Sequence, residues 1–153
     1  MQANAQGGFA IRGWIVAGLG TLVLLSLAAA CGGSDDAGAG EEELSLELVE
    51  QNGSGQSGTA TLAPTGDDST RIVVELESAP AKPQPAHVHS GSCDDIGNVF
   101  APLESLTDGT SESTVMLSLD ELQQGNLIVH AHKSEAEFDV SVACAAIPEA
   151  VSP

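Results

Sequence analysis

From residue 44 onward, apolar and polar residues alternate with a period of two, and turn-forming residues break the pattern at short intervals. Residues 44–48 and 137–144 show the alternation most clearly. Successive side chains of a β-strand point to opposite faces, so such runs predict strands with one buried face. No helical spacing of apolar residues is sustained over a comparable length in this region. The pattern therefore restricts the chain to an all-β fold.

The breaks divide this region into about eight short strands, which is typical of an antiparallel β-sandwich or barrel. Besides a strand around the first histidines, the expected strands span residues 44–48, 58–63, 71–76, 99–103, 113–119, 127–132 and 137–144. Asn52 and Gly53 predict a hairpin turn. Residues 79–85 are rich in proline and are expected to be a loop or an edge. Residues 90–95 are expected to be a loop, and residues 120–125 one helical turn capped by Asp120.

The first 30 residues have the composition of a secretory signal peptide. Arg12 precedes an apolar stretch that runs from Trp14 to Leu27, and three alanines follow it directly before Cys31. A basic start, an apolar centre and a small-residue exit are the features of a cleaved signal. An uncleaved membrane anchor is the alternative, but the apolar stretch barely reaches the ~20 residues that a membrane span requires.

Residues 27–31 resemble a bacterial lipobox, with Ala28 at the place where leucine is common. The resemblance implies that residues 1–30 are a lipoprotein signal peptide and that Cys31 is lipidated. Residues 31–43 are rich in glycine and acids, so we expect them to be a flexible tether. Residues 44–150 would then form a β-sandwich domain outside the cytoplasm, anchored by lipid to the cell membrane at the cell surface or in the periplasm.

The chain is strongly acidic, with a formal net charge of −18 and 22 acidic residues. Removal of the signal would take away Arg12 and no acid, leaving Arg71, Lys82 and Lys133 as the basic residues. Binding to nucleic acid needs clustered lysine and arginine, so nucleic acid is excluded as a partner. The overall field attracts cations.

Two cysteines remain once Cys31 is assigned to lipid. In an oxidising compartment, Cys93 and Cys144 are expected to form one disulfide. The alternative makes their thiols metal ligands, but neither has a second cysteine at the spacing of a metal site.

The four histidines of the chain form two His-x-His pairs, His87 with His89 and His130 with His132. Side chains two apart on a strand share a face, so each pair presents two imidazoles side by side. Neutral imidazole is a ligand for copper, zinc and nickel. The alternatives are exposed or merely hydrogen-bonded histidines and, for His132, a position in solvent beyond the strand end.

Several short motifs resemble two known families. Similarity to the chordin-type CHRD domain is found in residues 86–91, 98–103 and 119–130. Similarity to copper/zinc superoxide dismutases is found in residues 87–89, 128–130 and 142–147. Both resemblances cover roughly residues 57–148, and both imply a Greek-key β-sandwich of the immunoglobulin-like or dismutase-like kind.

The dismutase resemblance implies roles for individual residues. His87 and His89 match the first two copper ligands and His130 the last, while Cys93 and Cys144 match the disulfide. No histidine lies between His89 and His130, so the bridging histidine and the zinc site of that family are missing. Ser141 stands where the family has the arginine that guides superoxide.

Three functions from different classes follow from these residues. The first is a copper-binding redox protein with residual dismutase-type activity, and the second is metal capture or delivery without turnover. The third is a non-enzymatic CHRD-like binding or structural module without metal. The sequence favours a membrane-anchored lipoprotein that binds copper, or else zinc, through the metal-ligand candidates His87, His89, His130 and His132.

Overall fold

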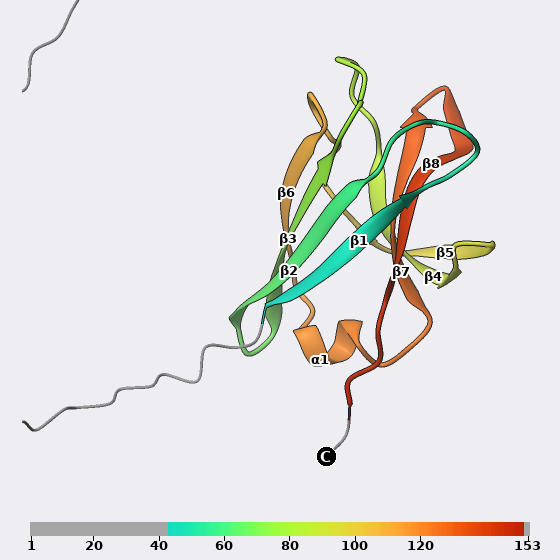
Figure 1. The fold of residues 1–153 in the computed structure, drawn as a ribbon. Helices are drawn as coiled ribbons and strands as arrows, with labels where there is room; N and C mark the ends of the chain where they lie inside the picture. The colour runs from blue at the N-terminus through green and yellow to red at the C-terminus, as the bar shows by residue number, and fades with distance from the viewer. Residues whose placement is uncertain (1–42, 152–153) are drawn as a thin grey trace, which may run out of the picture. The chain divides into compact units, whose positions relative to one another are not determined.

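Eight antiparallel strands and one short helix make up residues 43–151, the part of the chain that the computed structural model describes (Figure 1). The elements are β1 (Leu44–Glu50), β2 (Gly58–Gly66), β3 (Ser69–Leu76), β4 (Ala86–Ser92), β5 (Asp95–Pro102), β6 (Thr110–Val115), α1 (Leu119–Leu122), β7 (Leu127–Ser134) and β8 (Glu137–Ile147). The expectation of an all-β antiparallel fold of about eight strands is confirmed.

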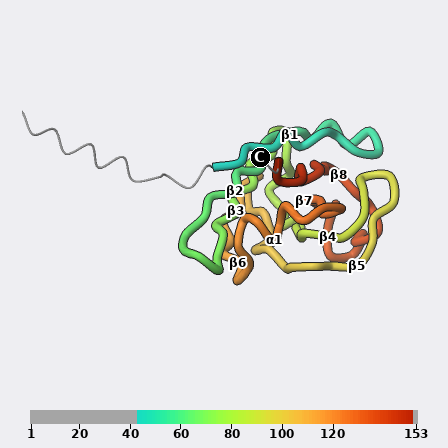
Figure 2. Tube along the Cα trace, turned by 90° about the horizontal axis from the view of Figure 1, so that it is seen from below, coloured from blue at the N-terminus to red at the C-terminus, as the bar shows by residue number. Residues whose placement is uncertain are grey.

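The strands form one curled sheet in the order β5-β4-β7-β8-β1-β2-β3-β6. β1 joins its two halves, because residues 44–48 pair with β2 whereas Val49 and Glu50 pair with β8. β4 lies beside β7 and β3 beside β6, so the chain crosses between the halves as in a Greek key. In the end-on view, β2, β3 and β6 lie on one side of the molecule and β4, β5 and β7 on the other (Figure 2).

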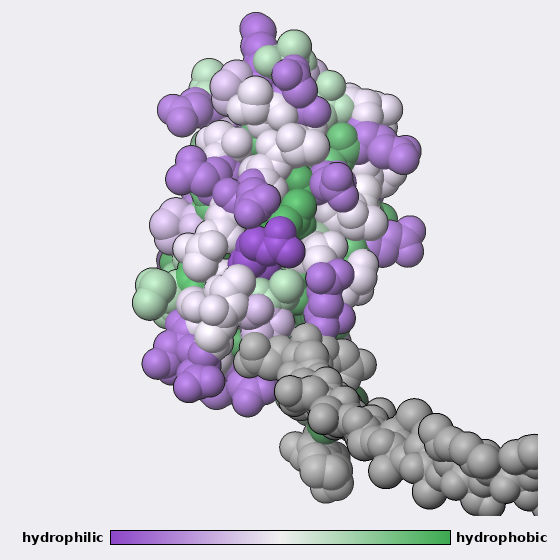
Figure 3. Space-filling model, turned by 90° about the vertical axis from the view of Figure 1, so that its left-hand side faces the viewer, coloured by the Kyte–Doolittle hydropathy of each residue, from purple (hydrophilic) through white to green (hydrophobic). Residues whose placement is uncertain are grey.

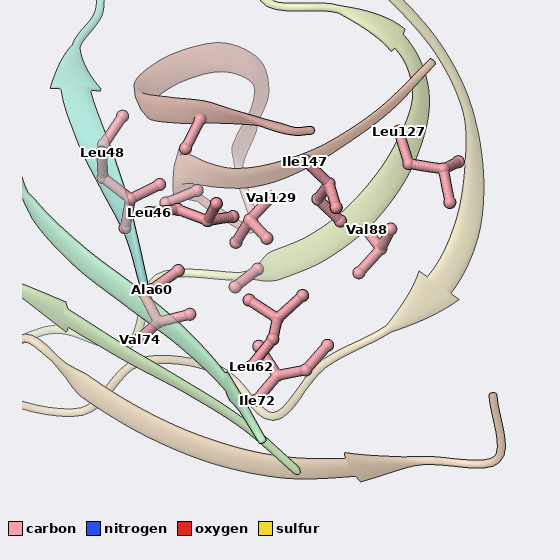
Figure 4. Packing of buried hydrophobic residues seen from close by; sticks show 14 of the residues in the cluster. Leu46, Leu48, Ala60, Leu62, Ile72, Val74, Val88, Leu127, Val129 and Ile147 are labelled. Carbon is pink, nitrogen blue, oxygen red and sulfur yellow. The ribbon is translucent and has the colours of Figure 1, made fainter. Parts of the chain in front are cut away.

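The core lies between the two halves and is built by the alternating apolar residues. Figure 4 shows aliphatic side chains from both halves pointing toward one another, among them Leu62, Ile72 and Val88. Each of these three is fully buried, and burying one such side chain stabilises the fold by about 1.5–3 kcal/mol. The face on the β6 side shows hydrophilic residues and residues of intermediate hydropathy, with a few apolar residues between them (Figure 3). Polar residues at alternate positions therefore face water, as the period of two predicts.

Local structure differs from the sequence expectation in three places. The strand expected over residues 113–119 is β6, which ends at Val115, and Leu119 is instead the first residue of α1. The expected loop over residues 90–95 is instead the end of β4, a two-residue turn and the start of β5. Gly91 makes this tight pairing achievable, because its φ of +102° suits glycine alone. The short helix is capped by Ser118 and not by Asp120: Ser118 accepts a hydrogen bond from the Glu121 backbone, and the Glu121 carboxylate accepts one from the Ser118 backbone.

A disulfide joins Cys93, in the turn between β4 and β5, to Cys144 on β8. The predicted pairing is confirmed, and the alternative of thiol metal ligands is wrong. The hairpin formed by β4 and β5 is thereby tied to the centre of β8. Because disulfides persist in oxidising compartments, the bond favours a location outside the cytoplasm.

Among residues 43–151, no helix is long and apolar enough to cross a membrane. The expected signal peptide (1–30), the lipidated Cys31 and nearly all of the expected tether (31–43) lie outside the described residues, so these stay predictions.

Candidate metal centre

The four predicted histidines lie on two neighbouring strands of one half of the sheet. His87 and His89 are on β4, and His130 and His132 are on β7, which pairs with β4. His87 is directly opposite His130, and residues opposite each other on paired strands share a face. The strand pairing thus joins the two His-x-His pairs into one cluster of four imidazoles.

Three of the four histidines form a compact group of ligand atoms. His87, His89 and His132 each contribute one ring nitrogen, and these nitrogens lie within 4.8 Å of one another. His132 Nε2 is 3.0 Å from His87 Nδ1 and 3.3 Å from His89 Nε2. His89 and His132 are buried, whereas His87 is partly exposed. The alternative reading, in which His132 lies in solvent beyond the strand end, is wrong, since His132 is part of β7 and only 3% exposed.

Two backbone carbonyls orient the buried rings. His89 Nδ1 lies 3.1 Å from the Gly97 carbonyl on β5, and His132 Nδ1 contacts the Phe138 carbonyl on β8. A carbonyl oxygen can only accept, so each Nδ1 must carry the proton and donate it. In the neutral rings, both Nε2 atoms then present lone pairs to the centre of the group. Such outer hydrogen bonds fix the tautomer of histidines that bind metals.

The backbone around His132 is also constrained. Its N–H donates to the Pro85 carbonyl at 2.9 Å, and its own carbonyl accepts from Gln84 Nε2 at 3.3 Å. β8 carries one extra residue, Val142, so that His132 faces Ser141 across the strand pair. The end of the proline-rich segment therefore helps to hold a ligand-bearing position on β7.

His130 lies beside the group without belonging to it. Its ring centroid is 4.3 Å from that of His132 and 5.2 Å from that of His89. The side chain is 2% exposed, and neither of its ring nitrogens has a hydrogen-bond partner among the described residues. An unpaired buried polar atom costs about 1–3 kcal/mol. His130 is therefore a buried imidazole with two free ring nitrogens at the edge of the site.

Burial favours the neutral form of His87, His130 and His132. Burial lowers the pKa of His130 to about 3, and repulsion from His132, His89 and His87 adds to the effect. Burial likewise lowers the pKa of His132 to about 4, against the raising effects of the Phe138 carbonyl and Asp139. The pKa of His87 is also lowered, by burial and then by His89. Neutral imidazole is the form that binds a metal.

The charged side chains near the histidine cluster are either acidic or part of an ion pair. Asp139 is close enough to act on the pKa of His132, and Lys133 forms an ion pair with Glu137 at 2.6 Å. Ser141 is 8% exposed and faces His132 across the strand pair. A short neutral side chain thus occupies the position where the dismutase resemblance would have an arginine.

The four histidines could be identified from the sequence, but the groups that orient them could not. Gly97 acts through its backbone carbonyl, for which no side-chain pattern exists. Phe138 was recognised only as an apolar position of a strand. The available sequence signal was an aromatic residue between the acids Glu137 and Asp139, in a chain with only 3% aromatic residues.

Comparison with known proteins supports the fold. No protein-family model matches the chain, and no curated protein does. A solved structure of a mutant superoxide dismutase 5 from Candida albicans matches with a TM-score of 0.56 and 18% sequence identity. The match covers 72% of this chain and 94% of that one. The chain therefore has a dismutase-like fold.

Proposed function

We propose that this protein is an exported, lipid-anchored metal-binding protein that holds one metal ion, preferably copper, in its histidine cluster. The observation that carries the proposal is the convergence of three ring nitrogens, from His87, His89 and His132, within 4.8 Å. The hydrogen bonds to Gly97 and Phe138 support it, because they leave the Nε2 lone pairs free. Anchoring through Cys31 rests on the sequence of the first 31 residues alone.

His130 is the proposed fourth ligand. Its two ring nitrogens are buried and unpartnered among the described residues, and its ring lies close to His132 and His89. Coordination would satisfy one of these nitrogens.

Copper is favoured over other metals by the chemistry of the donors. Imidazole nitrogen suits copper, zinc and nickel, and affinity for a given site generally peaks at Cu²⁺ in the divalent series. Zinc remains the second choice, because it also accepts nitrogen ligands. When bound, copper would supply one-electron redox chemistry, which zinc cannot.

Metal holding is favoured over efficient superoxide turnover, although residual dismutase-type activity is part of the proposal. The net charge of −18 opposes an anionic substrate, and the neutral Ser141 stands opposite His132. The same field favours the approach of a metal cation. Capture or delivery of copper at the membrane fits these charges best.

The test is titration of the whole chain, purified in a mild detergent, with Cu(II) under electron paramagnetic resonance. We expect one copper with several nitrogen ligands in the wild type and its loss in the His87→Ala/His89→Ala variant. His130→Leu and His132→Leu form a matched pair on one strand, and each should remove one nitrogen from the spectrum. If the wild type binds no more nitrogen-ligated copper than the double variant, the metal proposal is wrong.

The alternative is a CHRD-like extracellular binding or structural module without metal. It is favoured by the motif resemblance over residues 86–91 and 98–103. The same titration separates the two proposals, because a metal-free module would give only the spectrum of weakly bound surface copper. A superoxide assay on the copper-loaded protein then distinguishes turnover from metal holding.

A further inference from the structure

Phe138 occupies a position at which the fold does not require an aromatic residue. It is the second residue of β8, and its side chain is 40% exposed and absent from the hydrophobic core. Its chain neighbours Glu137 and Asp139 are both exposed acids. A large aromatic ring at such a position gains little from core packing, so its value must come from local contacts.

Those contacts are with the histidine cluster. The Phe138 ring stacks on His132 with a centroid separation of 3.9 Å and an interplanar angle of 17°. It also lies 5.3 Å from the ring of His87. His132 is 3% exposed whereas Phe138 is 40% exposed, so the phenylalanine lies on the solvent side of that ligand.

The backbone of Phe138 contacts the same histidine. Its carbonyl accepts the hydrogen bond from His132 Nδ1, and its ring covers the face of the same imidazole. Displacing Phe138 would therefore disturb both the orientation of His132 and its shielding from water. Stacked rings at 3.9 Å are in contact, so no ligand can enter between them.

We propose that Phe138 is the gating residue of the metal site, which slows metal release and admits only small, narrow exogenous ligands. The proposal rests on the proposed metal-binding function. We expect a slim anion such as azide to reach the metal beside the ring, and a planar five-membered ring such as imidazole to be blocked by it. Phe138 acts through His132 and the access path and is a positioning residue.

The test uses the whole copper-loaded chain in detergent with three variants, Phe138→Ala, Phe138→Leu and Phe100→Ala. Phe100 is the matched control, because it is 49% exposed on β5 and makes no aromatic contact with a histidine within residues 43–151. The first readout is the rate at which excess EDTA removes Cu(II). The second is the change in the paramagnetic resonance spectrum on adding imidazole or azide.

We expect Phe138→Ala to release copper about tenfold faster than the wild type, since an aromatic pair contributes roughly that factor. Imidazole should change the spectrum of Phe138→Ala but not that of the wild type or Phe100→Ala, while azide should change all three. Phe138→Leu keeps the bulk and should lie between. If Phe138→Ala fails to fold, Phe138→Leu is compared with the wild type by the same readouts.

Two negative results have different meanings. If the wild type binds nitrogen-ligated copper but the Phe138 variants match its release rate and its exclusion of imidazole, the gating proposal is wrong and the metal site stands. If the wild type binds no such copper, the proposed function itself fails, and the gating proposal fails with it.

Discussion

Acidification should destabilise the metal-free protein through two buried histidines, His130 and His132. The folded state holds the pKa of His130 at about 3 and that of His132 at about 4, against 6.5 in the unfolded chain. Below pH 6.5, His130 and His132 therefore bind protons in the unfolded chain more readily than in the folded chain. Stability is complete above that pH and is lost progressively as the pH falls toward the folded pKa values.

The magnitude at pH 5 follows from the unfolded pKa alone. At that pH both folded-state pKa values are still lower than the solution pH, so His130 and His132 stay neutral in the folded state. The gap of 1.5 pH units between 6.5 and 5 is worth up to about 2 kcal/mol per histidine. We expect a loss of up to about 4 kcal/mol between pH 8 and pH 5, before smaller contributions from His87.

Urea unfolding in the presence of EDTA, at pH 8 and at pH 5, measures this loss. Glu121 does not interfere, because hydrogen bonds from Ser118 lower its pKa from 4.5, and its contribution is lost only at more acidic pH. His130→Leu is the informative variant, since it removes one buried titrating group and two unpaired nitrogens. It should be at least as stable as the wild type at pH 8 and lose about 2 kcal/mol less on acidification. Equal losses in both proteins would contradict the lowered pKa of His130 in the folded state.

Three further changes test the fold. The disulfide between Cys93 and Cys144 closes a loop with a sequence separation of 51. Replacing both cysteines by serine should lower the free energy of unfolding by up to about 4 kcal/mol, measured by urea titration with EDTA. An unchanged unfolding midpoint would contradict this. Gly91→Ala puts a methyl group 2.3 Å from a backbone oxygen at a φ of +102° and should lower the melting temperature more than Gly53→Ala, which meets nothing within 4 Å. Leu62→Ala, at a fully buried position, should cost about 2–5 kcal/mol by the same urea assay, and a loss below 1 kcal/mol would show that the site can collapse.

The strands could be predicted because one periodicity determines both their existence and their buried face. In β3, for example, Ile72, Val74 and Leu76 are buried at every second position. Strand ends were less predictable, since they depend on backbone details. The turn around Cys93 was expected as a loop, but two adjoining strands run almost up to it, because Gly91 permits a close approach to β5.

The candidate site was predictable to the level of the four histidines and no further. Period two accounts for each His-x-His pair, but the convergence of His132 with the β4 pair depends on the extra residue in β8 and on the carbonyls of Gly97 and Phe138. These are properties of the backbone, and many different side chains are compatible with them, so the sequence does not reveal them. The motif resemblance implied His130 as the last ligand, whereas His132 completes the compact group and His130 lies beside it.

The disulfide joins the same strands that carry and orient the histidine site. Cys144 is the register partner of His130, and Cys93 sits in the hairpin whose Gly97 carbonyl orients His89. Reduction would remove the tie between that hairpin and β8, although β4 stays paired with β7, and we expect the looser hairpin to hold the His89 ring less firmly and to weaken metal binding. Thermodynamic linkage requires the reverse as well, so a bound metal must make the disulfide harder to reduce by the same free energy. If the proposed metal binds, this coupling would make the metal-bound protein both more stable and more resistant to reduction than the metal-free protein.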